Sequence, residues 1–551
     1  MEGIPPFEAT SLDAIPAKCA GVAATFRSGR TKDVAWRKVQ LRRLYWAIED
    51  YTGPLKAALQ QDLHKCGFEA ALSELDFVKS DCLFLEAHVD RLAADERLGA
   101  PEVPATFALA GLRTRKEPLG AVLIIGAFNF PVQLLLSPLV AAIAAGCTAV
   151  VKPSEMAPAT AMVLRTLIED RLDSDAFRVV NGAIDETTAL LDFRDTAAVS
   201  VSEDVPRGWA KILYTGSRQV ARIIATKAAQ TLTPVVLELG GLNPAFVTDH
   251  TPDLALAARR LLWGKSLNAG QVCISHNYVL VHRKVLDPFI HALQAAFAVS
   301  FPDGAHQSDL AHVVSDRHFA RLKGLLDASA GRVVVGGRMD QAALFMEPTA
   351  VLVDSASDPL IRSETFGPIF SILPVDSLDE AIRIANDVDP TPLALFAFGN
   401  KEEVKKILGS VNSGGANIND SFTHGSVSSV AFGGVGHSGT GSYRGYASFD
   451  AFTHRRTVAE TPGWMDRFLR VRYMPYDSRH TRLMNLLAPK PKFDRTGRSV
   501  RGLGYWVKLL LGLGGTGAKG AFVRWCGCLA VLLAYSGRDV KALTTLIWNR
   551  G

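Results

Sequence analysis

Short apolar strands alternate with helical segments between residues 121 and 214, and this alternation constrains the fold more than any other feature of the sequence. The expected strands are Ala121–Ile125, Ala149–Val151, Phe177–Val180 and Lys211–Tyr214, and the expected helices are Val132–Ala145, Ala159–Arg171 and Thr187–Asp192. Strands separated by helices of this length are typical of a doubly wound parallel sheet. Such a sheet binds nucleotides at the carboxyl ends of its strands.

The chain is long enough for more than one lobe of this kind. With 551 residues, 48% of them apolar, it has material for two or three packed lobes. A second strand–helix series runs from Val235 to about Phe398, and helical periodicity from Asp33 to about Ala94 precedes the first series. The sequence therefore predicts an α/β protein with a helical lead-in and two α/β lobes.

Cysteine usage and the N-terminus bear on the compartment. The seven cysteines are irregularly spaced and odd in number, which argues against a disulfide framework and favours a reducing compartment. The first twenty residues lack the basic start and apolar run of a secretory signal, and they lack the Arg-rich pattern of a transit peptide. We therefore expect synthesis to finish in the cytosol.

Residues 464–551 differ from the rest of the chain. They contain 16 Lys and Arg against four acidic residues, a charge of +12, whereas the whole chain has +5. Two apolar stretches, Tyr505–Leu513 and Trp525–Tyr535, are each shorter than a bilayer span. A basic, apolar tail favours attachment to a membrane surface on the cytosolic face, such as that of the endoplasmic reticulum or another organelle. Packing on a globular partner is the alternative, and the interleaved apolar runs argue against nucleic acid.

Three residues form a candidate chemical constellation. Cys273 lies in SLNAGQVCIS, where small neighbours suit an exposed turn, and an accessible cysteine with a lowered pKa is a strong nucleophile. Glu238 follows an apolar strand and precedes paired glycines that allow close backbone approach to a ligand. Asn129 follows the first strand, where its amide could stabilise an oxyanion. Taken singly, these residues could be a buried apolar thiol, a solvated strand-end charge and a turn former.

Seven motifs in order indicate a family. They are FNFP at Phe128–Pro131, VVKPSE at Val150–Glu155, YTGS at Tyr214–Ser217, LELGG at Leu237–Gly241, NAGQVC at Asn268–Cys273, ETFGP at Glu364–Pro368 and FGGVGHSGTG at Phe432–Gly441. Over residues 24–456 the chain resembles the aldehyde dehydrogenase superfamily. The chain is most similar to the class 3 branch of this superfamily, which includes the fatty aldehyde dehydrogenases. The segments that carry this similarity are Arg27–Thr31, Gln60–Lys65, Val314–Leu326 and Ser448–Arg456.

The resemblance implies a covalent mechanism. The thiolate of Cys273 would attack an aldehyde carbon, and Asn129 with the Cys273 amide would hold the oxyanion of the thiohemiacetal. After hydride transfer to a nicotinamide, water deprotonated by Glu238 would hydrolyse the thioester. A non-catalytic scaffold with the same fold is the alternative of a different class.

The resemblance also implies a cofactor site. Lys152 and Glu155 would approach the adenosine ribose, and Gly216, Ser217 and Val220 would meet the pyrophosphate at a helix N-terminus. Glu364 and Phe366 would hold the nicotinamide ribose and ring. NAD is favoured, because a carboxylate at Glu155 repels the 2′-phosphate of NADP, and NADP stays possible. No metal ion is expected.

Substrate, assembly and domain division follow as expectations. Long-chain fatty aldehydes are the first choice of substrate, an apocarotenal or other isoprenoid aldehyde is the second, and His424 is a weak candidate for the substrate funnel. A homodimer is implied through a segment near Phe449–His454. We expect a helical lead-in with an NAD-binding domain at 1–234, a catalytic domain at 235–430, a glycine-rich loop with an oligomerisation segment at 431–463, and the tail at 464–551.

Overall fold

The computed structural model describes residues 3–99, 110–197, 208–476, 493–499, 502–513 and 518–535, together with positions 103, 107, 478, 480–482 and 491. The chain divides into two compact units. The first comprises Met1–Leu98 with Leu112–Val458, and the second comprises Gly99–Gly111 with Ala459–Gly551. Both expected α/β lobes lie in the first unit.

The first lobe is built on a six-stranded sheet of order β17-β7-β6-β3-β4-β5. Its strands are β3 (Ala121–Ile125), β4 (Thr148–Lys152), β5 (Phe177–Val179), β6 (Lys211–Thr215), β7 (Val235–Glu238) and β17 (Gly439–Thr440). All are parallel except β17, which pairs antiparallel with β7. Val122 and Ile124 belong to one core cluster and Leu123 and Ile125 to another, so β3 is buried on both faces. The predicted doubly wound sheet is confirmed.

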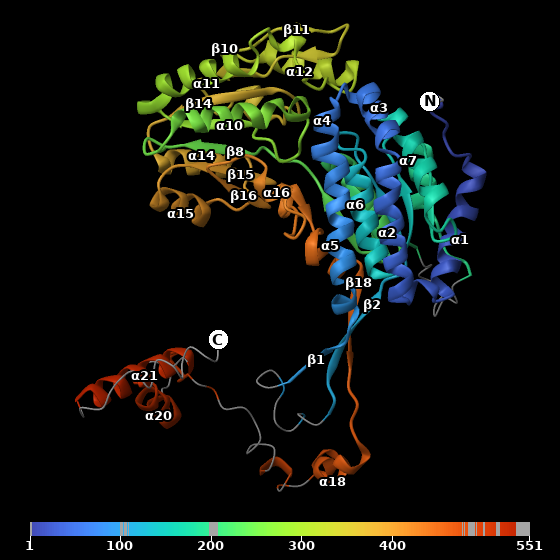
Figure 1. The fold of residues 1–551 in the computed structure, drawn as a ribbon, viewed down its shortest axis with the longest axis vertical. Coiled ribbons are helices and arrows are strands. Elements are labelled where there is room, and N and C mark those ends of the chain that lie inside the picture. The colour runs from blue at the N-terminus through green and yellow to red at the C-terminus, as the bar shows by residue number, and fades with distance from the viewer. Residues whose placement is uncertain are drawn as a thin grey trace. The chain divides into compact units, whose positions relative to one another are not determined.

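Helices cover both faces of this sheet, as that pattern of burial requires. The helices of one face are α2 (Val34–Asp50), α3 (Thr52–Leu63), α5 (Asp76–Ala93), α6 (Gln133–Ala145) and α7 (Pro158–Arg171). Figure 1 shows α2, α5 and α6 side by side. On the other face lie α1 (Ile15–Arg27), α8 (Ile184–Leu191) and α9 (Arg218–Ala229). The short α4 (Gly67–Ala70) and a π-helical turn at Ala71–Leu75 join α3 to α5.

The second lobe contains a seven-stranded sheet of order β10-β13-β14-β9-β8-β15-β16. Its strands are β8 (Pro244–Val247), β9 (Tyr278–His282), β10 (Arg332–Val335), β13 (Thr349–Leu352), β14 (Ile369–Val375), β15 (Ala394–Phe398) and β16 (Gly415–Ile418), and only β10 runs antiparallel. Its helices are α10 (Leu254–Ser266), α11 (Leu286–Ser300), α12 (Asp316–Ala328), α13 (Pro359–Arg362), α14 (Leu378–Val388), α15 (Lys401–Ser410) and α16 (Thr423–Ser426), and β11 (Met339–Asp340) pairs with β12 (Phe345–Met346).

The expected boundary after residue 234 does not match the sheets. β7 begins at Val235 and is hydrogen-bonded in the first sheet, and β17 also returns to it from residue 439. The apolar sequence of β7 does not indicate which sheet the strand joins, because the strands of both sheets are buried on both faces and have similar sequences.

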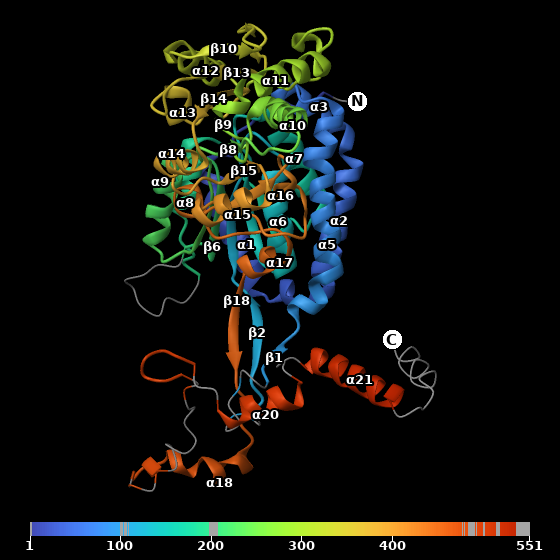
Figure 2. The same ribbon diagram turned by 90° about the vertical axis from the view of Figure 1, so that its left-hand side faces the viewer.

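A three-stranded antiparallel sheet of order β1-β2-β18 completes the first unit. It consists of β1 (Glu96–Arg97), β2 (Arg113–Pro118) and β18 (Thr453–Val458), and β18 follows α17 (Gly445–Ala451). Figure 2 shows β2 and β18 side by side. Phe449 and Phe452 are buried in the core of their own chain, whereas β18 lies at a sheet edge with His454 and Arg455 exposed.

The second unit contains α18 (Asp466–Leu469), α20 (Leu503–Leu511) and α21 (Ala518–Tyr535). Both predicted apolar stretches overlap helices, and large apolar side chains are exposed on them, among them Leu510 at 75% and Val523 at 68%. Within the described residues, one helix is long and apolar enough to cross a membrane, at Arg283–Gln307. That helix includes α11, whose Phe289 and Leu293 are buried in the second lobe.

Candidate functional site

The register of the first sheet gathers the expected site residues at one edge. Ile125 is paired with Lys152, and Thr215 is paired with Glu238, so parallel strands β3, β4, β6 and β7 end beside one another. In open α/β sheets this carboxyl edge is where ligands bind. The expected residues that end these strands or follow them are Asn129, Lys152, Glu155, Gly216, Ser217 and Glu238.

Cys273 comes from the second lobe, in the loop between α10 and β9. Asn268 and Ala269 precede it with φ values of 52° and 51°, and Gly270 follows them with φ of 68°. A Cβ on Gly270 would lie 2.2 Å from the carbonyl oxygen of Gly367, so only glycine lets this loop pack so closely on the ETFGP segment. Left-handed backbone at non-glycine residues persists where the surrounding contacts hold it.

Hydrogen bonds join this loop to Asn129. Asn129 Nδ2 donates to the carbonyl oxygen of Gln271 over 3.0 Å, and Asn268 Nδ2 donates to the carbonyl oxygen of Asn129 over 2.7 Å. Asn243 Nδ2 donates to the Cys273 carbonyl over 2.8 Å. Asn129 is only 2% exposed, so it belongs to the loop network and is not merely an exposed turn former.

Glu238, the last residue of β7, is a buried carboxylate. It is 3% exposed, and neither carboxylate oxygen has a hydrogen-bond partner among the residues that the structure describes. Burial raises its pKa well above the ordinary value, because a charge loses its hydration there. The alternative of a solvated strand-end charge is thereby excluded. A buried carboxylate with free oxygens is suited to accept a proton from water.

The electrostatics of Cys273 differ from the expected lowered pKa. Burial, with further contributions from the Glu238 and Glu364 carboxylates, raises the pKa of this half-buried thiol to about 12. Negative charges nearby disfavour the thiolate, whereas the expectation of a lowered pKa rested only on an exposed turn. The prediction of a lowered pKa for Cys273 is therefore wrong for the folded chain.

Lys152 and the start of α9 present groups that attract an anion. Lys152 is 3% exposed, and its Nζ donates to the Pro153 carbonyl over 3.0 Å and to Glu155 Oε2 over 3.1 Å. It is therefore a buried strand-end cation and not a solvated surface charge. Ser217 caps α9 by accepting the Val220 N–H over 3.4 Å, and the first turn of α9 contains no acidic residue. The remaining N–H groups of such a terminus favour phosphate.

Glu364 lies against the paired glycines. A Cβ on Gly240 would lie 2.1 Å from Glu364 Oε1, and the N–H of Gly241 donates to the same oxygen over 3.3 Å. These glycines therefore make room for a carboxylate of the protein. Burial raises the pKa of Glu364, and Arg218, the Gly241 N–H and other nearby cations oppose that rise.

Two cations that sequence reasoning missed hold the Glu364–Pro368 loop. Arg321 donates to the carbonyls of Glu364 and Thr365 over 2.9 and 2.6 Å, and the buried Lys265 donates to Thr365 Oγ1 and the Gly367 carbonyl over 3.1 Å each. Burial lowers the pKa of Lys265 to about 7. The signal available in the sequence was a lysine on the apolar face of α10.

Phe366 and His424 occupy different surroundings. Phe366 has a φ of 42°, and its ring centroid lies 5.8 Å from that of Phe128 in an edge-on contact. His424 is half-buried, and burial with the charge of Arg444 lowers its pKa to about 4. The next residue, Gly425, lies against the loop of Cys273, because an added Cβ there would lie 2.6 Å from Ile274 Cδ1.

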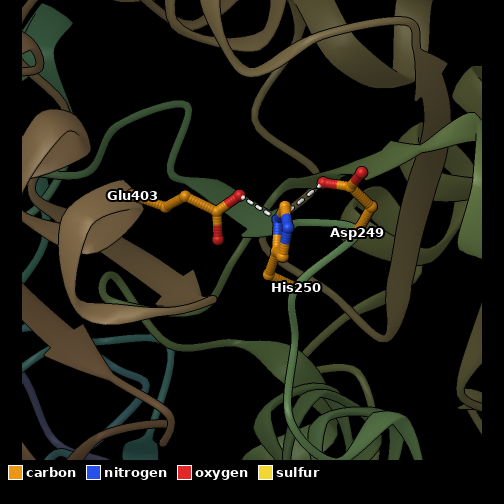
Figure 3. Close-up of side chains that lie close together, drawn as sticks. All are labelled: Asp249, His250 and Glu403. Carbon is orange, nitrogen blue, oxygen red and sulfur yellow. Dashed lines mark hydrogen bonds and ion pairs between the residues drawn. The ribbon is translucent and has the colours of Figure 1, made fainter.

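A separate polar cluster lies in the second lobe. Figure 3 shows His250 between Asp249 and Glu403, with its Nδ1 3.1 Å from Asp249 Oδ1 and 3.0 Å from Glu403 Oε1. Lys284 Nζ lies 3.0 Å from Asp249, and Thr248 donates to Glu403 over 2.7 Å. The Glu403 hydrogen bond and both carboxylates raise the pKa of His250. These mutual pairs tie the end of β8 to α15.

The chain is similar to known proteins over most of its length. The pattern described as the aldehyde dehydrogenase family matches residues 7–458. The chain is 56% identical to the beta-apo-4'-carotenal oxygenase of Neurospora crassa over 97% of both chains. It is 37% identical to aldehyde dehydrogenase family 3 member B1 of Mus musculus over 86% of this chain and 97% of that relative. The solved structure of substrate-bound Staphylococcus aureus AldH is 32% identical, with a TM-score of 0.79 over 86% of this chain and 99% of that one.

The carboxylate beside Cys273 gives a testable pH effect. In Glu238→Gln the negative charge that disfavours the thiolate is removed, so the Cys273 pKa falls and iodoacetamide reacts faster. At a pH above the pKa of Glu238 we expect about a tenfold increase, which corresponds to about 1.4 kcal/mol of Coulomb energy. At a pH below that pKa, wild type and variant should react alike, because Glu238 is then neutral.

Peptide mass spectrometry measures the alkylation rate of the Cys273 peptide. The half-buried Cys66 in the same sample serves as an internal control, because no shift in its rate is expected. Equal Cys273 rates in both proteins at every pH would contradict the electrostatic assignment.

Proposed function

We propose residue roles and a substrate class for this chain, which belongs to the aldehyde dehydrogenase family and oxidises an aldehyde to a carboxylic acid with NAD(P). Its likeness to class 3 members is confirmed. The observation that carries the proposal is that Asn129 is hydrogen-bonded to the loop of Cys273, while Glu238 keeps both carboxylate oxygens unpaired among the described residues.

Cys273 is the proposed nucleophile. Its thiolate adds to the aldehyde carbon, and the carbonyl oxygen of the aldehyde becomes the oxyanion of a thiohemiacetal. An amide nitrogen carries two hydrogens, so Asn129 Nδ2, which donates one to Gln271, retains one for this oxyanion. The N–H of Cys273 is the second proposed donor. Preorganised donors of this kind are worth about 10²–10³ in rate.

The proposed cofactor residues fit a dinucleotide. Lys152 and Glu155 would meet the adenosine ribose, Gly216, Ser217 and Val220 the pyrophosphate, and Glu364 and Phe366 the nicotinamide riboside. Two features support this assignment: the buried Lys152 Nζ is a donor suited to ribose hydroxyls, and the N-terminus of α9 favours the anionic pyrophosphate. When bound, NAD(P) accepts the hydride that leaves the thiohemiacetal carbon.

Glu238 is the proposed base of the hydrolytic half. It takes a proton from water, the hydroxide adds to the thioester carbon, and the carbon–sulfur bond breaks to give the acid and Cys273. Aldehyde, oxidised cofactor and water thus give acid, reduced cofactor and a proton. The raised pKa of Glu238 makes its carboxylate a stronger base than an exposed one, and hydrolysis is favoured at a pH above that raised pKa, where the carboxylate is ionised.

An apolar aldehyde is the proposed substrate class, and a conjugated apocarotenal is preferred within it. Phe130, Leu134, Val272, Ile274 and Phe422 belong to one apolar cluster against which Cys273 packs. An apolar chain gains about 25 cal/mol per Å² that it buries there. The Neurospora crassa relative, 56% identical over 97% of each chain, supports an apocarotenal over the saturated fatty aldehydes that the sequence placed first.

A panel of aldehydes tests this preference. We expect kcat/KM for a conjugated apocarotenal to exceed that for a saturated aldehyde of similar length by about tenfold or more, because a rigid polyene loses less conformational entropy on binding. NAD(P)H absorbance is followed for both series. Values that rise steadily with saturated chain length and surpass the polyene would assign the enzyme to fatty aldehydes instead.

The tail is proposed to attach the enzyme to a membrane surface on the cytosolic side. Exposed apolar residues on α20 and α21 include Leu510, Leu511, Phe522, Val523 and Val531. With the +12 charge of residues 464–551, these side chains suit an anionic bilayer surface, where apolar substrates dissolve.

A homodimer is also proposed, and the exposed edge of β18 supports it, because an unpaired edge can accept another strand.

Removal of residues 490–551 tests the attachment. The full chain should sediment with phosphatidylcholine vesicles that contain phosphatidylserine, and high salt should weaken binding, since salt screens the basic residues. The shortened chain should stay in the supernatant and keep its kcat on a short, water-soluble aldehyde. As a matched control, Leu510→Glu with Val531→Glu in the full chain should reduce binding without changing its length. A full chain that stays in solution with these vesicles would refute the attachment.

A further inference from the structure

Lys65 and Glu74 form an ion pair beneath the loop that carries Asn129. Lys65 Nζ lies 2.7 Å from Glu74 Oε1, and both side chains are 0% exposed. Lys65 follows α3, and Glu74 lies in the π-helical turn before α5. Desolvation of two buried charges offsets most of their attraction, so stability alone does not explain the pair.

Both members of the pair also bind the backbone around Asn129. Lys65 Nζ donates to the carbonyl oxygen of Asn129 over 3.2 Å and lies 4.4 Å above the ring of Phe130. The second oxygen of Glu74 accepts the N–H groups of Val132 and Gln133 over 3.0 and 2.9 Å. The pair therefore holds the FNFP segment on both sides of Phe130.

The nucleophile loop reaches the same peptide from its other side. Asn268 Nδ2 donates to the Asn129 carbonyl over 2.7 Å, and the Asn268 N–H donates to Glu69 over 2.8 Å. Glu69 lies in α4, between Lys65 and Glu74 in the sequence. One carbonyl oxygen, that of Asn129, thus receives donors from the helical lead-in and from the loop of Cys273.

We propose that Lys65 and Glu74 are positioning residues for the reaction, which fix the direction of the Asn129 amide toward the oxyanion. The inference rests on the proposed oxyanion role of Asn129. Rotation of the Asn129 peptide would move the amide relative to Cys273, and a misplacement of about 1 Å can cost about 10²-fold in rate. Neither Lys65 nor Glu74 touches a reacting atom. Through Asn129, however, these two residues of the helical lead-in would control the rate at which the Cys273 thiolate adds to the aldehyde.

The double variant Lys65→Met with Glu74→Leu is the primary test. It removes both members of the ion pair together, so neither is left as a buried charge facing the place of its lost partner. We expect kcat to fall about 10- to 100-fold while KM changes less than about threefold, because the pair acts on the transition state through Asn129. Alkylation of Cys273 by iodoacetamide forms no oxyanion, so its rate should change less than about twofold.

Coupling to Asn129→Ala separates positioning from general damage. If the pair acts through Asn129, the double variant should lose much less activity in the Asn129→Ala background than in the wild type. An equal loss in both backgrounds, or an unchanged kcat in the double variant, would overturn the positioning role. Full activity in Asn129→Ala alone would instead refute the proposed oxyanion function, so the two failures are distinguishable.

Two further variants protect the test against misfolding. Asn268→Gly keeps a residue that tolerates positive φ and deletes the Nδ2 donor, which binds the Asn129 carbonyl and, over 3.1 Å, the Gln271 carbonyl, so it should show the same kcat loss and the same coupling. Ser137→Ala is the matched control, because it removes another buried hydrogen bond, from Ser137 Oγ in α6 to Asp81 in α5 over 2.6 Å, in which no atom of Asn129 takes part. It should lower the unfolding temperature but leave kcat unchanged, and a kcat loss equal to that of Asn268→Gly would contradict the inference.

Discussion

The carbonyl oxygen of Asn129 is the point on which the arrangement of the site depends. It accepts hydrogen bonds from Asn268, in the loop of Cys273, and from Lys65, which follows α3 within the helical lead-in. The side chain of Asn129 donates in turn to Gln271, two residues before the cysteine. One peptide thereby connects the loop after β3 of the first sheet to the loop before β9 of the second, and the relative position of nucleophile and amide follows from these bonds.

Burial changes the pKa values of the groups in this site, with opposite consequences for the two proposed steps of the reaction. Glu238, Glu364 and Cys273 lie close enough for their charges to interact, and burial raises the pKa of each group. A low dielectric strengthens every interaction with developing charge, but it also penalises the thiolate that is proposed to begin the reaction. The carboxylate that disfavours the thiolate is the one proposed to activate water later. The position of Glu238 beside Cys273 therefore disfavours the proposed attack of the thiolate and favours the proposed hydrolysis of the thioester.

Much of the fold could be predicted because its periodicity is local. The strands near Ala121 and Thr148 and the helices between them lie where apolar runs and spacing indicate, since these signals sit within a few residues. The sheet to which β7 belongs was assigned wrongly, because strand pairing is a long-range property that a buried apolar run does not encode.

The residues of the site divide in the same way. The motifs identify Cys273, Glu238 and Asn129, but the raised pKa of Cys273 arises from carboxylates that approach only in the folded chain. Lys265 and Glu74 were missed because an isolated charge in a helical segment reads as a solvated residue until its burial is known. The family resemblance therefore suggests the roles of the reacting groups, whereas only the structure identifies the residues that hold those groups in place.

Mass spectrometry can test whether the reaction passes through an acyl group on Cys273 and whether hydrolysis of that group needs Glu238. Glu238→Gln is mixed with an excess of NAD and of an apolar aldehyde, quenched in acid and digested. We expect about one reduced cofactor per chain in a burst, followed by slow turnover, and an added acyl mass on the Cys273 peptide. Turnover at the wild-type rate, or an acyl group on another residue, would contradict this expectation.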